Sequence, residues 1–228
     1  MTIFYYTLKR ALRNKQTLIV ISLIPLIMIF IPMLWEGKSL IGYTLYGTVI
    51  LYGSFLLTRT IMSDRVNGIV IRIFSAPIRT IKYLSQSLLA YSSLLIGQII
   101  LVLVIGALLY KWDIILVIKL FLCYTIFAMT SIGFSLAWNS LFRSKVMSDA
   151  VFSIVISLMS ILGGVFIPID LLPTFFKRLG MIFPSYWLSN ALINLIGYKD
   201  FQNYLLSLGM LALFTVAFTI FGSIRRLE

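Results

Sequence analysis

Long apolar stretches alternate along this chain with short basic ones. A membrane-spanning helix needs about 20 mostly apolar residues to cross about 30 Å of hydrocarbon. Six stretches meet this requirement, namely Thr17–Trp35, Leu40–Met62, Tyr83–Tyr110, Ile114–Trp138, Met147–Ile169 and Asn203–Ser223. Strands are disfavoured, because these stretches show no period-two alternation and an open sheet could not satisfy its backbone in lipid. The pattern predicts an all-α integral membrane protein with six transmembrane helices and a single membrane domain over residues 1–228.

Composition supports lipid as the solvent of most of the chain. Hydrophobic residues make up 61% and charged residues only 11% of the 228 residues, with a mean hydropathy of +1.04. A soluble domain of this size needs more charge on its water-facing positions. The net charge of +12 would suggest nucleic acid in a soluble protein. Here the cations cluster between apolar runs, as in the cytoplasmic loops of membrane proteins, so we expect no nucleic-acid partner.

The distribution of lysine and arginine predicts the orientation of the chain. Cytoplasmic loops carry an excess of these residues. The richer set of loops holds thirteen cations, namely Lys9, Arg10, Arg13, Lys15, Arg59, Arg65, Arg72, Arg79, Lys82, Arg143, Lys145, Arg225 and Arg226. The other set holds five, which are Lys38, Lys111, Lys177, Arg178 and Lys199. We therefore predict a multi-pass protein of the bacterial cytoplasmic membrane with both termini in the cytoplasm.

Residues 1–15 precede the first span and form a basic, partly apolar segment. Ile3, Phe4, Leu8, Ala11 and Leu12 recur at helical spacing, with cations between them. This spacing predicts an amphipathic helix at the inner membrane surface. The alternative is a basic flank without fixed structure that only directs topology.

The cytoplasmic stretch 63–82 is too long for a plain connection between two spans. Its apolar residues Ile69, Ile71, Ile73 and Phe74 precede Pro77, which would end a short helix. Such a helix would present an apolar surface to a protein outside the membrane. A helix that only touches lipid headgroups explains the same residues equally well.

The outer stretch 163–200 is apolar but interrupted by Pro168, Pro173, Gly180 and Pro184. Each proline removes a helical hydrogen bond, so a continuous span is disfavoured. We predict two short helices, about Leu171–Leu179 and Tyr186–Leu195, that form a re-entrant hairpin over residues 170–198. Broken helices at membrane depth need protein or a cavity beside them, so this hairpin is expected to cover or gate something. A seventh span is the alternative, and it would place the C-terminus outside.

The ordered set of these features resembles the ABC-2 type permeases, the membrane subunits of many ATP-driven exporters. The resemblance covers nearly the whole chain and rests on the N-terminal helix and two motif groups. These are Asp64-Arg65-x-x-Gly68 with Ala76-Pro77-Ile78-Arg79 and Tyr83-Leu84, and Gly163-Gly164-x-Phe166-x-Pro168 with Leu172-Pro173 and Phe183-Pro184.

The resemblance implies where coupling and gating residues would lie. It places a coupling helix, which docks on a separate ATPase subunit, within Asp64–Pro77, and an exit gate in the outer hairpin. The implied coupling residues are Asp64, Arg65, Gly68, Ile73, Phe74 and Pro77, and the implied gate residues are Gly163, Gly164, Pro168, Pro173 and Pro184. ATP and Mg would bind the partner subunit, and this chain would hold no cofactor.

Catalytic chemistry is missing from the sequence. There is no phosphate-binding G-x-x-x-x-G-K-[ST] motif, no histidine, no metal-ligand cluster, and a single cysteine, Cys123. We therefore expect no enzyme activity in this chain. The ionisable side chains that we place inside the spans are Arg59 and Lys119, with no acidic group among them. This disfavours a secondary transporter, which usually needs an intramembrane carboxylate or histidine to meet its coupling ion. That class and a non-transporting scaffold or immunity protein remain the alternatives.

Six helices are few for enclosing a transport pathway, so we expect a second copy or a homologous permease as partner. The polar residues Ser92, Ser93, Gln98, Thr125, Thr130, Ser131 and Ser135 could line that interface or serve ordinary packing. An interior with little charge suggests an amphipathic or lipophilic cargo, such as a drug, an antimicrobial peptide or a lipid-like molecule. Efflux of such cargo would confer antibiotic resistance.

Overall fold

The computed structural model describes residues 2–36, 40–66, 80–142, 144–167, 169–198 and 200–224. Throughout these ranges the regular structure is helical, as predicted, and no strand occurs. The elements are α1 (Thr2–Arg13), α2 (Lys15–Ile29), α3 (Pro32–Trp35), α4 (Ile41–Val66), α6 (Thr80–Tyr110), α7 (Ile114–Leu141), α8 (Lys145–Leu162), η1 (Ile169–Leu171), α9 (Thr174–Gly180), α10 (Pro184–Leu192), η2 (Ile193–Tyr198) and α11 (Phe201–Ile224).

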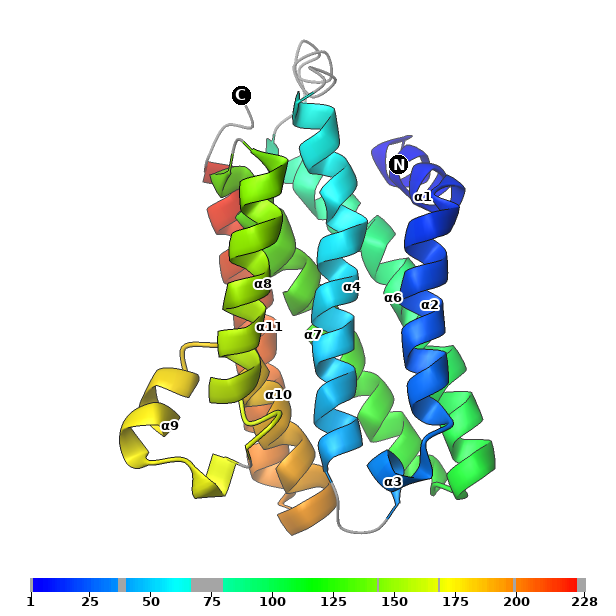
Figure 1. Cartoon of the computed structure of the whole chain (residues 1–228), viewed down its shortest axis with the longest axis vertical. Helices are drawn as coiled ribbons and strands as arrows, with labels where there is room; N and C mark the ends of the chain where they lie inside the picture. The colour runs from blue at the N-terminus through cyan, green and yellow to red at the C-terminus, as the bar shows by residue number, and fades with distance from the viewer. Residues whose placement is uncertain are drawn as a thin grey trace.

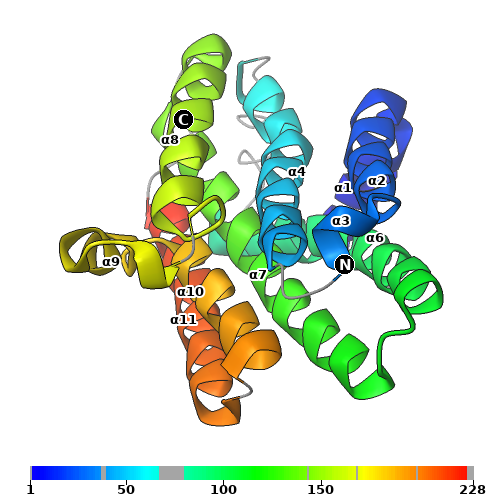
Figure 2. The same cartoon turned by 60° about the horizontal axis from the view of Figure 1, so that its bottom comes forward.

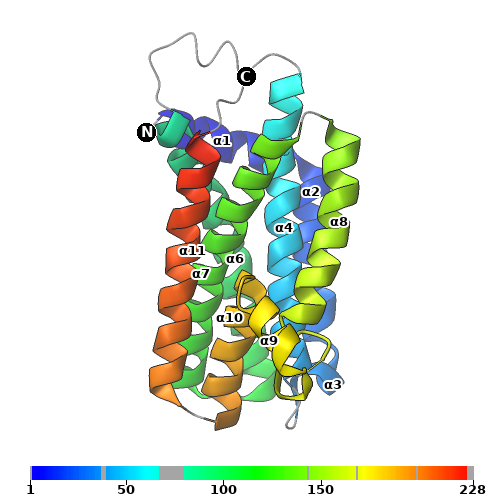
Figure 3. The ribbon, with the colours of Figure 1, turned by 90° about the vertical axis from the view of Figure 1, so that its left-hand side faces the viewer.

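The long helices α2, α4, α6, α7, α8 and α11 run lengthwise beside one another, and α1 lies across one end of them (Figures 1 and 3). We call this end, which also holds the C-terminal end of α11, the basic end. The opposite end carries α3, α9, α10 and η2, and we call it the hairpin end (Figure 1). Because α1 and the last residues of α11 lie at the same end, the chain crosses the bundle an even number of times between them.

Five helices are each long and apolar enough to cross a membrane, or up to seven spans result if each of two bent helix pairs counts as one. The five are α4, α6, α7, α8 and α11. The predicted count of six falls within this range and stays a prediction. At a rise of 1.5 Å per residue, the 31 residues of α6 extend about 46 Å, so this helix exceeds the hydrocarbon thickness.

The first predicted span, Thr17–Trp35, is wrong as a single helix. The helix α2 ends at Ile29, and after Phe30 and Ile31 a separate turn, α3, begins with a proline at its first position. Two aromatic side chains satisfy carbonyls freed at the end of α2. Trp35 Nε1 donates to Met28 O at 2.9 Å, and the Tyr110 hydroxyl donates to Ile29 O at 2.6 Å. These bonds explain how the helix can end at Ile29 without leaving its last carbonyls unpaired.

The N-terminal segment is helical from Thr2 to Arg13, and its axis is bent by 75° from that of α2. Asn14 caps the helix that follows, since its side-chain oxygen accepts a hydrogen bond from Thr17 N at 3.4 Å. Ala11 is buried against the bundle, whereas Leu12 is exposed. Placement of α1 at the membrane surface stays a prediction.

The predicted cytoplasmic stretch 63–82 begins within a helix, because α4 continues to Val66 and α6 starts at Thr80. The backbone of Asp64 and Arg65 belongs to the last turns of α4. Gly68, Ile73, Phe74 and Pro77 lie outside the described residues.

The predicted fifth span, Met147–Ile169, is also too long, since α8 ends at Leu162. Gly163 caps α8, and Gly164 adopts a φ of +78°, which reverses the chain direction. A Cβ on Gly164 would overlap the side chain of Ile169, so both the conformation and the close approach require glycine. The chain then leaves the lengthwise direction and forms the hairpin.

Candidate functional site: the α2–α4–α8 groove and its two ends

One face of the bundle presents α4 between α2 and α8 (Figure 1). A groove of about 210 Å³ lies on this face, over α4. Ile21 and Ile24 of α2 form one wall, and Ile156 of α8 belongs to the other side. Its floor includes Tyr52 and Gly53, where the missing glycine side chain leaves space.

The chemistry of the groove is almost entirely apolar. Thr48 and Tyr52 supply the hydroxyl groups among its lining residues, and no lining residue carries a charge. Thr48 shares a hydrogen bond with Ser160 of α8 at 3.4 Å between the two hydroxyl oxygens. Tyr52 is 42% exposed, which leaves its ring accessible from the groove. This surface can contact hydrocarbon or aromatic groups but offers no charge to an ionic ligand.

At the basic end, charged side chains link α4 to α8. Arg59 of α4 donates to Asp149 of α8 in a hydrogen-bonded ion pair. Next to it, Lys145 Nζ donates to Ser63 Oγ at 3.4 Å, again joining the two helices. The last turns of α4, which lead into the predicted coupling segment, are therefore tied to the start of α8.

The Arg59–Asp149 pair corrects the sequence interpretation. Asp149 lies within the predicted span Met147–Ile169, so the expectation that the span interiors hold no acidic side chain is wrong. An arginine in one predicted span and an aspartate in another could have suggested such a pair from the sequence. A carboxylate already paired with a guanidinium is not free to bind a coupling sodium ion, so the pair does not favour a secondary transporter.

A second polar row joins α4 to α7. Ser54 and Ser135 share a hydrogen bond of 3.0 Å between their hydroxyl oxygens, and Asn139 Nδ2 donates to Thr58 Oγ1 at 3.1 Å. Such bonds between neighbouring helices hold their register in an apolar surrounding. Ser135 was a candidate for an interface with a second copy, and the structure uses it for packing within the chain.

Thr130 has the same role between α7 and α11, because its hydroxyl donates to Leu211 O at 2.9 Å. Gln98 differs from these residues. Both polar atoms of its buried side-chain amide lack a hydrogen-bond partner among the described residues.

At the hairpin end, α9 and α10 form two helices bent by 108° between the axis of Thr174–Gly180 and that of Pro184–Tyr198. No continuous helix runs through this segment, as its prolines predicted. The bounds differ from the predicted Leu171–Leu179 and Tyr186–Leu195, because Pro173 caps α9 and Pro184 occupies the first turn of α10. Whether the hairpin enters the membrane stays a prediction.

The structure brings one of the two proposed gate glycines, Gly163, to the start of α10. Ser185 Oγ donates to Met159 O in the last turn of α8 at 2.7 Å. A Cβ on Gly163 would overlap both of these atoms. Gly180 lies against the Leu162 carbonyl in the same way. The end of α8 and the start of α10 are therefore in backbone-close contact.

Of the other proposed gate residues, Pro184 is buried beside Ser185 at the start of α10, and Gly164 packs against Ile169. Pro173 is exposed at the start of α9, and Pro168 lies outside the described residues. The helix α10 is buried over most of its surface and packs between α4, α7, α8 and α11, whereas α9 projects to the side (Figure 2). Phe175 of α9 is 65% exposed.

This architecture, with five long apolar helices and two bent helix pairs among the described residues, is that of a multi-pass membrane protein. Within the described ranges, no group of three or more histidine, cysteine, aspartate or glutamate side chains could hold a metal ion. A family model described as ABC-2 family transporter protein matches residues 10–224. The chain belongs to this family, which confirms the resemblance drawn from its motifs. Comparison with individually characterised proteins gives no match.

Proposed function

We propose that this chain is the membrane subunit of an ATP-driven exporter that moves an amphipathic or lipophilic cargo outward. The observation that supports this most is family membership over residues 10–224. The sequence has no phosphate-binding motif of its own, so hydrolysis must occur on a separate P-loop ATPase subunit. ATP and Mg bind that partner in this proposal.

The groove between α2, α4 and α8 is the proposed cargo surface. Its uncharged lining suits a molecule that partitions into the bilayer before transport. The hydroxyls of Thr48 and Tyr52 can orient a cargo that carries hydrogen-bonding groups. A drug, an antimicrobial peptide and a lipid-like molecule all satisfy this description.

The groove is open on the side away from α4, so one copy of the chain does not enclose it. In our proposal a second copy, or a homologous permease, faces this groove and completes the pathway. The face contributes exposed aliphatic side chains, including Val20 at 40% and Ile24 at 43%. Such a surface can contact either lipid or another protein. Only contact with another protein would enclose the cargo.

Two contacts suggest how ATP binding reaches the hairpin end. A displacement of the coupling segment would move the end of α4, which the Arg59–Asp149 pair ties to α8. The other end of α8 contacts α10 through the hydrogen bond between Ser185 and Met159. A shift of α8 therefore changes the position of the hairpin, which we propose as the exit gate.

The groove assignment is tested by filling it. A Cβ on Gly53 would sit 3.7 Å from Ile21 and Leu95, an ordinary van der Waals distance, so alanine is tolerated there. Gly53→Leu would extend into the groove and is expected to reduce cargo transport at least tenfold. Gly209→Leu is the matched control, because no atom lies within 4 Å of its added Cβ.

The assay is ATP-dependent uptake of an uncharged lipophilic dye and of a dansylated amphipathic peptide into inside-out vesicles. Gel filtration of fluorescently tagged protein reports whether each variant folds. Tyr52→Ala, at an exposed position, widens the groove without crowding α2 and should change the preference between the two probes. Equal transport of both probes by wild type, Gly53→Leu and Tyr52→Ala would show that cargo passes elsewhere.

The coupling assignment is tested by placing a charge on the segment between α4 and α6. Ile73→Asp or Phe74→Asp would bury an unpaired carboxylate in an ATPase groove, at a cost of several kcal/mol. At about 1.4 kcal/mol per tenfold in affinity, the ATPase subunit should bind at least a hundredfold more weakly. Co-purification of that subunit with each variant measures this.

Val146→Asp is the control, because Val146 is 79% exposed at the same end of the bundle. It should retain the ATPase subunit. If Ile73→Asp and Phe74→Asp both bind the ATPase subunit and transport cargo as fully as wild type, the coupling assignment is wrong. The segment would then be only a helix at the membrane surface.

A further inference from the structure

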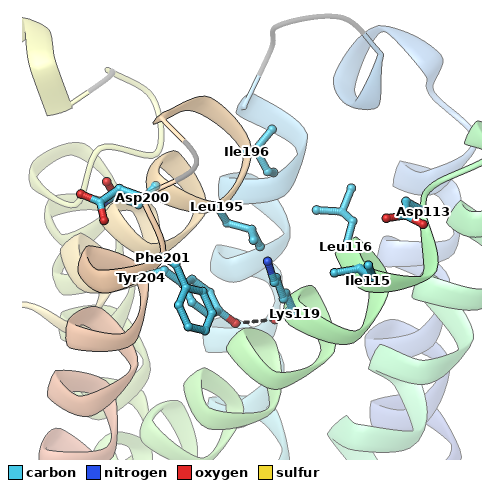
Figure 4. A pocket seen from close by; sticks show the side chains of 10 residues that line it. Asp113, Ile115, Leu116, Lys119, Leu195, Ile196, Asp200, Phe201 and Tyr204 are labelled. Atoms are coloured by element: carbon cyan, nitrogen blue, oxygen red, sulfur yellow. Dashed lines mark hydrogen bonds between the residues drawn. The ribbon is translucent and has the colours of Figure 1, made fainter.

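A second pocket, of about 320 Å³, opens at the hairpin end between α7, η2 and α11, away from the α2–α4–α8 groove. Figure 4 shows Lys119 of α7 reaching into it, with Asp113 and Asp200 on opposite sides of the lysine. Leu195 and Ile196 of η2 contribute apolar wall. The pocket therefore combines one cation, two carboxylates and a hydrocarbon surface.

The lysine is held in place but not neutralised. Its Nζ lies 5.3 Å from the centroid of the Phe201 ring, a cation–π distance. The Tyr204 hydroxyl donates to the Lys119 carbonyl at 2.8 Å and fixes the start of α11 against α7. Among the described residues no carboxylate forms an ion pair with Lys119. Its ammonium group can therefore bind an anion.

The two acidic side chains differ in availability. Both carboxylate oxygens of Asp200 are engaged at the start of α11, where they accept hydrogen bonds from Gln202 N at 3.0 Å and from the Asn203 side chain at 2.6 Å. Asp113 precedes α7 without capping it. Asp113 is exposed at the rim, and its carboxylate can receive a cationic group of a ligand.

The order of Asp113 and Lys119 along the bundle axis can be compared with the order of charges in a phospholipid headgroup. Asp113 lies six residues before Lys119, which corresponds to about 9 Å along α7, with the acid at the rim and the lysine deeper. In an ethanolamine phospholipid the phosphate lies between the glycerol and the ethanolamine. The phosphate is therefore nearer to the hydrocarbon than the amine is. A lysine below an aspartate matches that order, and the apolar wall can receive acyl chains.

We propose that this pocket binds the phosphoethanolamine headgroup of a membrane phospholipid, in the leaflet at the hairpin end. Lys119 holds the phosphate, as lysine does in many phosphate sites. Asp113 accepts hydrogen bonds from the primary ammonium group. A trimethylammonium headgroup has no N–H to donate, so the site distinguishes ethanolamine from choline lipids.

Native mass spectrometry of the delipidated protein tests the proposal without cargo or ATPase. The probes are phosphatidylethanolamine, phosphatidylcholine and phosphatidylglycerol with identical acyl chains, supplied in competition. Phosphatidylethanolamine should be retained at least fivefold over phosphatidylcholine. Lys119→Gln should lower retention of all three lipids at least tenfold, and Lys119→Arg should restore it.

Asp113→Asn should remove the preference for ethanolamine over choline while leaving total lipid retention within twofold of wild type. Arg178→Gln removes an exposed cation of α9 that does not line the pocket, and should change nothing. Unchanged retention in Lys119→Gln, an equal loss in Arg178→Gln, or an unchanged preference in Asp113→Asn would each overturn the proposal. Displacement of the lipid by an equal concentration of free O-phosphoethanolamine would identify a soluble anion as the occupant and overturn the assignment to lipid.

Discussion

The ion pair between Arg59 and Asp149 is expected to contribute measurably to stability, unlike an ordinary surface pair. Solvent-exposed ion pairs typically contribute about 0.2–1 kcal/mol to the free energy of unfolding. Here the side chains are 41% and 27% exposed, and the Nε of the arginine and Oδ1 of the aspartate are fully buried. Those two atoms have no hydrogen-bond partner in the described parts of the chain.

The magnitude follows from the partial burial. Two unit charges at about 4 Å attract by roughly 4 kcal/mol at an effective dielectric constant of about 20. Desolvation and side-chain entropy offset much of this. A fully buried pair that loses one partner costs about 3–5 kcal/mol, because one charge remains uncompensated. For this half-buried pair we expect each single substitution, Arg59→Gln or Asp149→Asn, to cost about 2 kcal/mol, and a coupling energy of about 1–2 kcal/mol.

A double-mutant cycle measures the coupling directly. The free energy of unfolding is obtained by titrating dodecylmaltoside-solubilised protein with sodium dodecyl sulfate. Tryptophan fluorescence is a suitable signal, since Trp138 Nε1 donates to Ser148 O next to the pair at 3.4 Å. The double variant Arg59→Gln/Asp149→Asn should be more stable than the sum of the single losses predicts.

The control cycle uses Arg13→Gln and Glu36→Gln, whose positions lie at opposite ends of the bundle and should show no coupling. If the pair also transmits movement from α4 to α8, the single variants should retain the ATPase subunit but lose transport. A coupling energy below about 0.5 kcal/mol would place the pair among ordinary surface contacts and refute this reasoning.

Two further predictions concern topology and the hairpin contact. In a Cys123→Ala background, an impermeant maleimide added to intact cells should label Thr174→Cys but not Ser144→Cys, because the hairpin end is expected outside and the basic end inside. The reverse pattern would contradict the orientation. Gly163→Val should lower the free energy of unfolding by about 2–3 kcal/mol in the same titration, since its side chain would overlap Ser185 and the α8 backbone. Gly209→Val, which meets no neighbour, should cost less than about 1 kcal/mol, and similar losses in both variants would contradict the packing argument.

The sequence by itself indicated that lipid surrounds most of the chain and that its secondary structure is helical. Apolar stretches of spanning length admit only helices in lipid, because every backbone group must find a partner within its own segment. The same local chemistry predicted the interruptions of the outer segment. Pro173 and Pro184 cannot continue a helix, and they stand at the starts of α9 and α10. Motif order was sufficient for the family, since it depends on spacing along the chain.

Helix ends were predicted less well, because composition does not show where tertiary contacts satisfy a terminus. The residues Thr17–Trp35 look like one apolar span. They divide into α2 and α3 because Trp35 and Tyr110 can satisfy the carbonyls at the break. Trp35 lies seven residues after Met28 in the sequence, whereas Tyr110 comes from α6. No local pattern contains that second contact.

The groove and the charged links depended wholly on the tertiary structure. Gly53 lies in an apolar run like many others, and only the approach of α2 and α8 makes its missing side chain part of a groove. Arg59 and Asp149 are 90 residues apart, so their pairing is a property of how α4 packs on α8. The sequence fixes each side chain's chemistry, but the distance between two side chains on different helices arises only when packing brings those helices together.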